Sequence, residues 1–215
     1  MAHLTSRQRF HSRRSRRRLF METLETRTLL AGDLPISLSD PDYVGHLLQA
    51  GDGQASDVLG RAVAIDGDLA VIGAPLTNIA GAADAGAVYV YRLLNSSWQQ
   101  RAKLIALDAN ANDQFGSSVA IQGATIVVGA PLDDEFGADA GAAYVFVGSD
   151  STWTEDAKLS NAAAGDHFGH AVSVDQDRIV VGSPLDDTSQ NNTGSAFIYE
   201  RNTAGQWPLI NQVLA

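Results

Sequence analysis

Three stretches of this sequence repeat one pattern: VLGRAVAIDGDLAVIGAP at residues 58–75, QFGSSVAIQGATIVVGAP at residues 114–131, and HFGHAVSVDQDRIVVGSP at residues 167–184. Each copy is followed by a second short pattern and a tryptophan: GAVYVY with Trp98, GAAYVF with Trp153, and GSAFIY with Trp207. The copies start 56 and 53 residues apart, so the repeat unit has about 55 residues. Repeats of this size form propellers, solenoids or arrays, because a single unit cannot bury its own apolar faces and stacks on its neighbours.

Within each copy the apolar residues recur with a period of two and are mostly β-branched or aromatic, which predicts strands rather than helices. In the middle copy we expect four strands, at about residues 116–121, 125–129, 142–147 and 152–159. Asp66-Gly67 and Gln122-Gly123 predict tight hairpins between the first two strands, because glycine takes the positive φ that a two-residue turn requires. Asp175-Gln176-Asp177 must form the same turn without a glycine, which is less favourable.

Recurrent small and polar residues mark the strand ends. The prolines at 75, 131 and 184 cannot donate to a sheet, so each should end its strand. The glycines at 73, 129 and 182 should allow close backbone approach where the repeats converge. The aspartates at 57, 113 and 166 precede the glycine of each copy, where a short carboxylate accepts backbone N–H bonds in a turn. We expect this role to be structural, because no copy places a base next to the carboxylate.

These motifs resemble the FG-GAP repeat, the blade unit of integrin alpha-subunit propellers and of many bacterial surface proteins. The Phe-Gly pair is Phe115-Gly116 and Phe168-Gly169, with Leu59-Gly60 in the first copy. Gly-Ala-Pro occurs at residues 73–75 and 129–131 and becomes Gly-Ser-Pro at 182–184. The resemblance implies an all-β fold, a partial β-propeller of three four-stranded blades. We expect it within residues 33–215, with approximate units at 47–104, 105–159 and 160–214.

The N-terminal segment differs in charge from the repeats. Residues 1–27 contain eight Arg and two Glu and carry a net charge of +6, which leaves −16 for the rest. We expect residues 1–32 to be a disordered targeting segment; a nucleic-acid-binding arm and a start-site artefact are the alternatives. Residues 24–30, Leu-Glu-Thr-Arg-Thr-Leu-Leu, resemble the LEPR-XLL motif of exported bacterial proteins, with Thr26 in place of the proline. The resemblance implies export, to the cell surface or the extracellular space.

Composition excludes several classes of function. The acidic repeats repel phosphate backbones, so we expect no nucleic-acid partner. The chain has no cysteine, which excludes disulfides and thiol catalysis. No stretch approaches 18 consecutive apolar residues, so we expect no transmembrane helix.

The search for sites yields acidic loop residues as the only candidates for a metal ion. Many FG-GAP blades carry a calcium loop between their first two strands, but here the links are short hairpins, so we expect no cofactor and a fold that does not depend on calcium. A divalent ion at one rim would bind the loop acids Asp133, Asp134, Asp139, Asp186 and Asp187. Solvated loop acids are the favoured interpretation. His167 and His170 have no third ligand nearby in sequence. We find no nucleophile and base in a catalytic pattern and expect no enzyme activity.

The favoured function is that of an exported bacterial binding or adhesion module with a protein or glycan ligand. The alternatives are a structural segment of a larger surface scaffold and, third, a propeller enzyme. Propellers typically use four to eight blades, so three blades should leave an apolar face bare at each end. We expect either a longer array or self-association of two copies into a ring of about six blades. Residues 46–49 resemble the last strand of a preceding unit, and residues 33–50 are the alternative cap.

Overall fold

The computed structural model describes residues 48–188 and 193–214, and this part of the chain is built from strands, turns and loops without a helix. The strands are β1 (Val63–Asp66), β2 (Leu69–Ala74), β3 (Ala87–Leu94), β4 (Ser97–Leu104), β5 (Ser118–Gln122), β6 (Thr125–Ala130), β7 (Ala142–Ser149), β8 (Thr152–Leu159), β9 (Ala171–Asp175), β10 (Arg178–Ser183), β11 (Ser195–Glu200) and β12 (Leu209–Leu214). The basic segment and the LEPR-XLL-like residues lie outside the described residues. No helix that is long and apolar enough to cross a membrane occurs in the described part.

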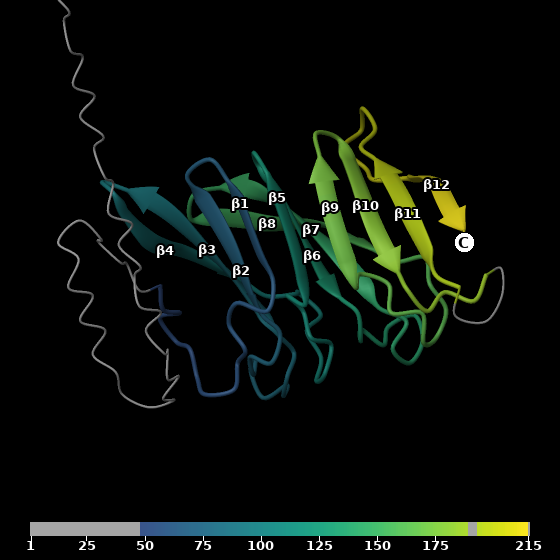
Figure 1. Cartoon of the computed structure of the whole chain (residues 1–215), viewed down its shortest axis with the longest axis horizontal. Helices are drawn as coiled ribbons and strands as arrows, with labels where there is room; N and C mark the ends of the chain where they lie inside the picture. The colour runs from purple at the N-terminus through teal and green to yellow at the C-terminus, as the bar shows by residue number, and fades with distance from the viewer. Residues whose placement is uncertain (1–47, 189–192, 215) are drawn as a thin grey trace, which may run out of the picture. The chain divides into compact units, whose positions relative to one another are not determined.

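The strands form three separate four-stranded sheets, each a meander in chain order: β1 to β4, β5 to β8, and β9 to β12. All pairings are antiparallel. The sheets follow one another in sequence order, with β5 against β1 and β9 against β5 (Figure 1). The fold is therefore the predicted one, three four-stranded blades of a partial β-propeller, and we refer to them as the first, second and third blade.

The first two strands of each blade are joined by a two-residue turn. Gly67, Gly123 and Gln176 are the first residues of these turns, and their φ angles are +57°, +54° and +54°. Gly67 and Gly123 adopt this conformation without a steric penalty, whereas Gln176 places a Cβ in the left-handed region. The third blade therefore has the same hairpin as the others, at a cost that the sequence predicts.

The prolines end the second strand of each blade as predicted. β2, β6 and β10 stop at Ala74, Ala130 and Ser183, immediately before Pro75, Pro131 and Pro184. In the second blade β6 is buried on both faces from Ile126 to Ala130, as its continuous apolar sequence predicts.

Two apolar layers join the three blades. Between the first and second blades, Val71 and Val90 pack with Val128, Tyr144 and other residues of the facing sheet. Between the second and third blades, the layer includes Val127, Val145, Ile179, Val181 and Phe197. Phe115 lies in the first layer and Phe168 in the second, each in edge or tilted contact with aromatic rings of its own blade. The Phe-Gly phenylalanines are thus core residues of the junctions.

Glycines allow the backbones to meet at both junctions. A Cβ atom on Gly73 would overlap the carbonyl oxygen of Gly116, and one on Gly129 would overlap the carbonyl oxygen of Gly169. Gly182 has no such neighbour among the described residues; the nearest atom to a Cβ there would be 3.5 Å away. The predicted close approach is confirmed at the two positions where a next blade exists.

The two end faces differ, and the expectation of a bare face at each end is correct only in part for the first blade. Val63 and Ile65 of β1, on its outer face, are 68% and 66% exposed, whereas the middle of that face is covered. Tyr89 and Tyr91 on its outer face are buried, with Leu48 and Ala50 packed against them. On the third blade, β10 alternates between buried and exposed residues although its sequence is as apolar as that of β6. The physical reason is that residues 48–50 cover β2 and β3 on the first face but not β1, while no described residue covers the outer face of the third blade.

Replacing Gln176 by glycine should stabilise the protein by about 1 kcal/mol, because glycine takes the positive φ of this turn without strain. The measurement is the free energy of unfolding in urea. Asp177→Gly is the matched control, since position 177 is in the same turn and does not have a positive φ. A gain from Asp177→Gly equal to that from Gln176→Gly would contradict the assignment of strain to position 176.

Candidate functional site at the loop rim

One end of the three sheets carries the long connections. The loops from β2 to β3, from β6 to β7 and from β10 to β11 lie at the lower end in Figure 1, with the connections from β4 to β5 and from β8 to β9. The other end carries hairpins. We call the end with the long connections the loop rim; its sequences differ most between copies, as in Thr77-Asn78 against Asp133-Asp134.

The rim of the second blade contains a lysine surrounded by carboxylates. Lys158, near the end of β8, places its Nζ 2.6 Å from Asp108 Oδ2, 2.9 Å from Asp133 Oδ2 and 2.5 Å from Glu135 Oε2. The Tyr144 hydroxyl donates to Asp133 Oδ2 at 2.7 Å and lies 2.9 Å from Asp108 Oδ1. Asp133 is only 2% exposed. A buried carboxylate needs a cation and donors of this kind, so we interpret the group as a structural ion cluster, and call it the Lys158 cluster.

The pKa shifts agree with this interpretation. Burial favours the neutral form of Lys158, but its hydrogen bonds to Asp108, Glu135 and Asp133 raise its pKa above the usual value. Burial raises the pKa of Asp108 as well, but Lys158 and Tyr144 outweigh this effect and hold it below its usual value. Burial, and then Asp133, raise the pKa of Tyr144. Lysine and tyrosine therefore stay protonated and act as permanent donors.

The first blade has a smaller version of the Lys158 cluster, and the third blade has none. The register pairs Tyr144 with Lys158, and the same pairs are Tyr89 with Lys103 in the first blade and Phe197 with Gln212 in the third. Lys103 Nζ lies 2.5 Å from Asp52 Oδ2, and the Tyr89 hydroxyl donates to Asp52 Oδ1. The third blade has neither the lysine nor the tyrosine. The three rims thus share a scaffold and differ in charge.

Sequence reasoning missed this network, although one signal was present. Lys103 and Lys158 are the only two lysines of the 215 residues, and they occupy equivalent positions in two repeats. A cation repeated within a strongly acidic region indicates a fixed partner. The partner itself could not be identified, because the carboxylates come from two loops that lie far from Lys158 in the sequence.

The aspartates before each Phe-Gly position have the predicted structural role. Asp57, Asp113 and Asp166 accept the backbone N–H of Gln54, Asn110 and Ala163, at 2.8, 2.7 and 2.6 Å. Burial, partly offset by the Asn110 bond, raises the pKa of Asp113 to about 6. These carboxylates fix the turns that lead into the blade junctions.

The structure does not bring the metal candidates together. Asp133 belongs to the Lys158 cluster, and Asp134 accepts the backbone N–H of Asp139 at 2.7 Å. Asp186 is buried and accepts the backbone N–H of Thr188 at 2.8 Å; Asp187 follows it in the same loop of the third blade. Within residues 48–188 and 193–214, no three His, Cys, Asp or Glu side chains are grouped as metal ligands. The ammonium of Lys158 lies where a cation would sit among Asp108, Asp133 and Glu135. Calcium independence stays a prediction.

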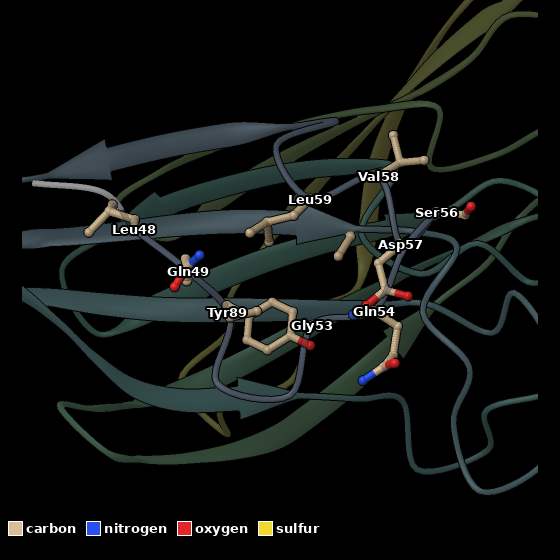
Figure 2. Close-up of a pocket in the computed structure, with 11 residues that line it drawn as sticks. Leu48, Gln49, Gly53, Gln54, Ser56, Asp57, Val58, Leu59 and Tyr89 are labelled. Carbon is tan, nitrogen blue, oxygen red and sulfur yellow. Dashed lines mark hydrogen bonds between the residues drawn. The ribbon is translucent and has the colours of Figure 1, made fainter. Parts of the chain in front are cut away.

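A second feature is a cavity of about 370 Å³ on the outer side of the first blade. Figure 2 shows Leu48 and Gln49 at one end, Asp57 and Val58 at the other, and Tyr89 between them. Leu59, which stands where the other copies have phenylalanine, also lines it. The equivalent space at the next junction is occupied by the preceding blade, since Phe115 pairs with Gly86 there. The cavity is thus the place of a missing neighbour.

Comparisons with known proteins agree with the repeats. A family model described as FG-GAP repeat matches residues 46–91, 98–146 and 153–199. A second, described as Planctomycete extracellular, matches residues 15–34. No curated protein is similar enough to count as a relative. Among solved structures, a Europium-containing methanol dehydrogenase is similar, at 14% identity and a TM-score of 0.46, over 70% of this chain and 23% of that protein. The chain therefore spans less than a quarter of that protein's length.

Removing the central cation should destabilise the second blade strongly. We expect Lys158→Met to lower the free energy of unfolding at pH 7 by about 3 kcal/mol, because it leaves buried Asp133 without its ion-pair partner. Lys103→Met is the matched control and should cost about 1 kcal/mol or less, since its partner Asp52 is largely exposed. Urea unfolding measures both.

The pH dependence gives a second readout of the same variant. Without Lys158, the carboxylate pKa values in the folded state rise above those in the unfolded state, so Lys158→Met should gain stability as the pH falls below 7. In the wild type, the depressed pKa of Asp108 means that its contribution is lost as the pH falls. The difference in free energy of unfolding between the wild type and Lys158→Met should therefore become smaller towards pH 4. Equal losses of unfolding free energy in Lys158→Met and Lys103→Met would contradict a structural role for the Lys158 cluster.

Proposed function

Because this chain belongs to the FG-GAP repeat family, we propose that it is an extracellular binding or adhesion module whose rim loops contact a protein or glycan partner. The family and the match to a Planctomycete extracellular model point to an extracellular or surface location. Beyond this location, we propose that the protein has a ligand and that the ligand contacts the rim loops.

The distribution of sequence differences supports a binding role for the loop rim. The blades repeat the same strands, turns and junction glycines, whereas the connections after β2, β6 and β10 have nearly equal lengths but differ in sequence and charge. Loops on a rigid scaffold are where binding residues concentrate, because their sequences can vary without disturbing the core.

The observation that carries the proposal is the exposure of Phe136 in the loop of the second blade. Phe136 is 55% exposed, and the ammonium of Lys158 lies 5.7 Å from the centre of its ring. Asp134, Glu135 and Asp139 flank it in the same loop. An aromatic ring beside a partly buried cation and flanked by carboxylates suits stacking on a sugar ring or packing against a basic protein surface.

We infer that the N-terminal segment directs export. The supporting observations are the excess of arginine in residues 1–27, the LEPR-XLL-like residues 24–30, and the Planctomycete extracellular match at residues 15–34, which includes residues 24–30. In this proposal the basic segment directs the chain to export, and the acidic repeats bind the protein or glycan partner outside the cell.

The proposal includes no catalytic activity. The hydroxyls of Ser117, Ser118 and Ser183 donate to backbone carbonyls and are not activated by a base. The alternative is a structural segment of a larger surface scaffold, which would have no ligand at the rim.

Arrays of glycans and of extracellular proteins, probed with the full-length protein, test the proposal. We expect the protein to bind at least one glycan or one extracellular protein on the arrays. Phe136→Ala should lower the affinity for that ligand about tenfold or more, because removal of a central aromatic contact has an effect of this size. Leu93→Ala is the control, because Leu93 is exposed at the hairpin end of the first blade. Absence of any retained ligand, or equal binding by Phe136→Ala and wild type, would favour the structural alternative.

A further inference from the structure

Each internal junction is made from the same two halves. The following blade supplies the Phe-Gly segment, whose backbone N–H donates to the preceding blade: Phe115 to Ala85 and Phe168 to Ala140, both at 2.9 Å. The preceding blade supplies two glycines, Gly73 with Gly86 in the first blade and Gly129 with Gly141 in the second. A Cβ on any of these four glycines would overlap the Phe-Gly segment.

The third blade carries the glycine half of such a junction, and no segment within residues 48–188 and 193–214 is docked on it. Gly182 and Gly194 stand at the equivalent positions, and a Cβ on Gly182 would meet no atom closer than 3.5 Å. The apolar positions are also kept. Val127 is fully buried and Leu159 is 5% exposed, whereas their counterparts Val180 and Val213 are 39% and 51% exposed.

The fourth strand of each blade has a bulge. The bulge residue is charged in β4 and β8, at the two internal junctions, and apolar in β12, on the outer face of the third blade. Arg101 in β4 makes a two-point ion pair with Asp150 of the second blade, at 2.6 and 2.9 Å. Asp156 in β8 accepts the Trp207 indole N–H of the third blade at 3.1 Å. The bulge residue of β12 is Ile210, which is exposed. An isoleucine at this contact position favours an apolar partner over water.

The first blade carries the other half. Val58 and Gly60 have φ angles of +56° and +95°, and Gln114 and Gly116 have +54° and +95°, so the segment is already in its docked conformation. For a β-branched residue such as Val58 this conformation is strained. Leu59 is 37% exposed at the cavity of Figure 2, and its N–H meets no acceptor in the described part of the chain.

We propose that a second copy of this chain docks the Leu59-Gly60 edge of its first blade on the outer face of the third blade. Both halves of the junction occur on one chain, and they continue the two junctions already present. Two copies joined twice in this way make a closed ring of six blades, within the four to eight that propellers use, whereas three copies would make nine. The proposal does not depend on a ligand at the loop rim.

Docking has one specific cost. The register places Val213 where Leu104 and Leu159 lie, and Leu48 precedes Asp52 by the same spacing as Leu104 precedes Asp108. Val213 of the incoming copy and Leu48 therefore compete for one position. The ring forms when residues 48–50 leave the face of the first blade, so weakening their packing should strengthen association.

Sedimentation velocity of the full-length protein over a range of concentrations tests the ring. We expect a concentration-dependent change from the 22.7 kDa monomer to a species of twice that mass. Val213→Asp on the third blade and Leu59→Asp on the first should each weaken association about tenfold or more, because each places a charge at an apolar position of the junction. Leu48→Ser should strengthen it. Leu107→Asp is the control, since Leu107 is exposed and lies on neither end face.

Mixing the variants distinguishes this arrangement from others. Val213→Asp keeps an intact first-blade edge and Leu59→Asp keeps an intact third-blade face, so a mixture should form a heterodimer through one intact junction. A dimer made of two third-blade faces would be insensitive to Leu59→Asp. The proposal is overturned by a wild type that stays monomeric, by Leu59→Asp associating like wild type, or by species larger than a dimer. Circular dichroism of each variant excludes unfolding as the cause.

Discussion

The blade junctions depend on one backbone contact, in which the carbonyl of a Phe-Gly glycine lies against the glycine near the end of the preceding blade's second strand. Gly116 meets Gly73 and Gly169 meets Gly129 so closely that a side chain has no room. This approach brings the sheets near enough for their valines and aromatic rings to form one dry layer. The carboxylate of Asp113 holds the turn that leads into the first of these contacts. The proline after each strand, the positive φ values and the apolar second strands all serve the same geometry.

Electrostatics adds a second constraint at the rim. The repeats are strongly acidic, so each carboxylate that becomes buried there needs a donor or a cation. In the second blade Lys158 and Tyr144 supply both, and in the first Lys103 and Tyr89 do so for a more exposed aspartate. The third blade lacks the pair. Such a rim can change its charge from blade to blade without altering the junctions, which is what a scaffold for binding loops requires.

The sequence predicts the blades well because their signals are local. A period of two, a glycine in a two-residue turn and a proline after a strand act within a few residues, so the strands and hairpins could be placed from them. The Lys158 cluster could not, since Asp108 lies between β4 and β5, Asp133 between β6 and β7, and Lys158 in β8, and these segments meet only in the folded chain. The cover on the first blade was equally hidden: Leu48 packs there because of where the chain runs, and the apolar sequence of β10 gives no sign that one of its faces is exposed.

The same substitution at two equivalent glycines tests the junction contact most directly. Gly129→Ala places a methyl group against the carbonyl of Gly169, and Gly182→Ala places it where the nearest atom is 3.5 Å away. In urea unfolding at a concentration where the protein is monomeric, Gly129→Ala should lose about 2 kcal/mol or more, and Gly182→Ala should change the stability by less than about 0.5 kcal/mol or raise it. Equal effects at the two positions would contradict the claim that the blade junction rests on this contact.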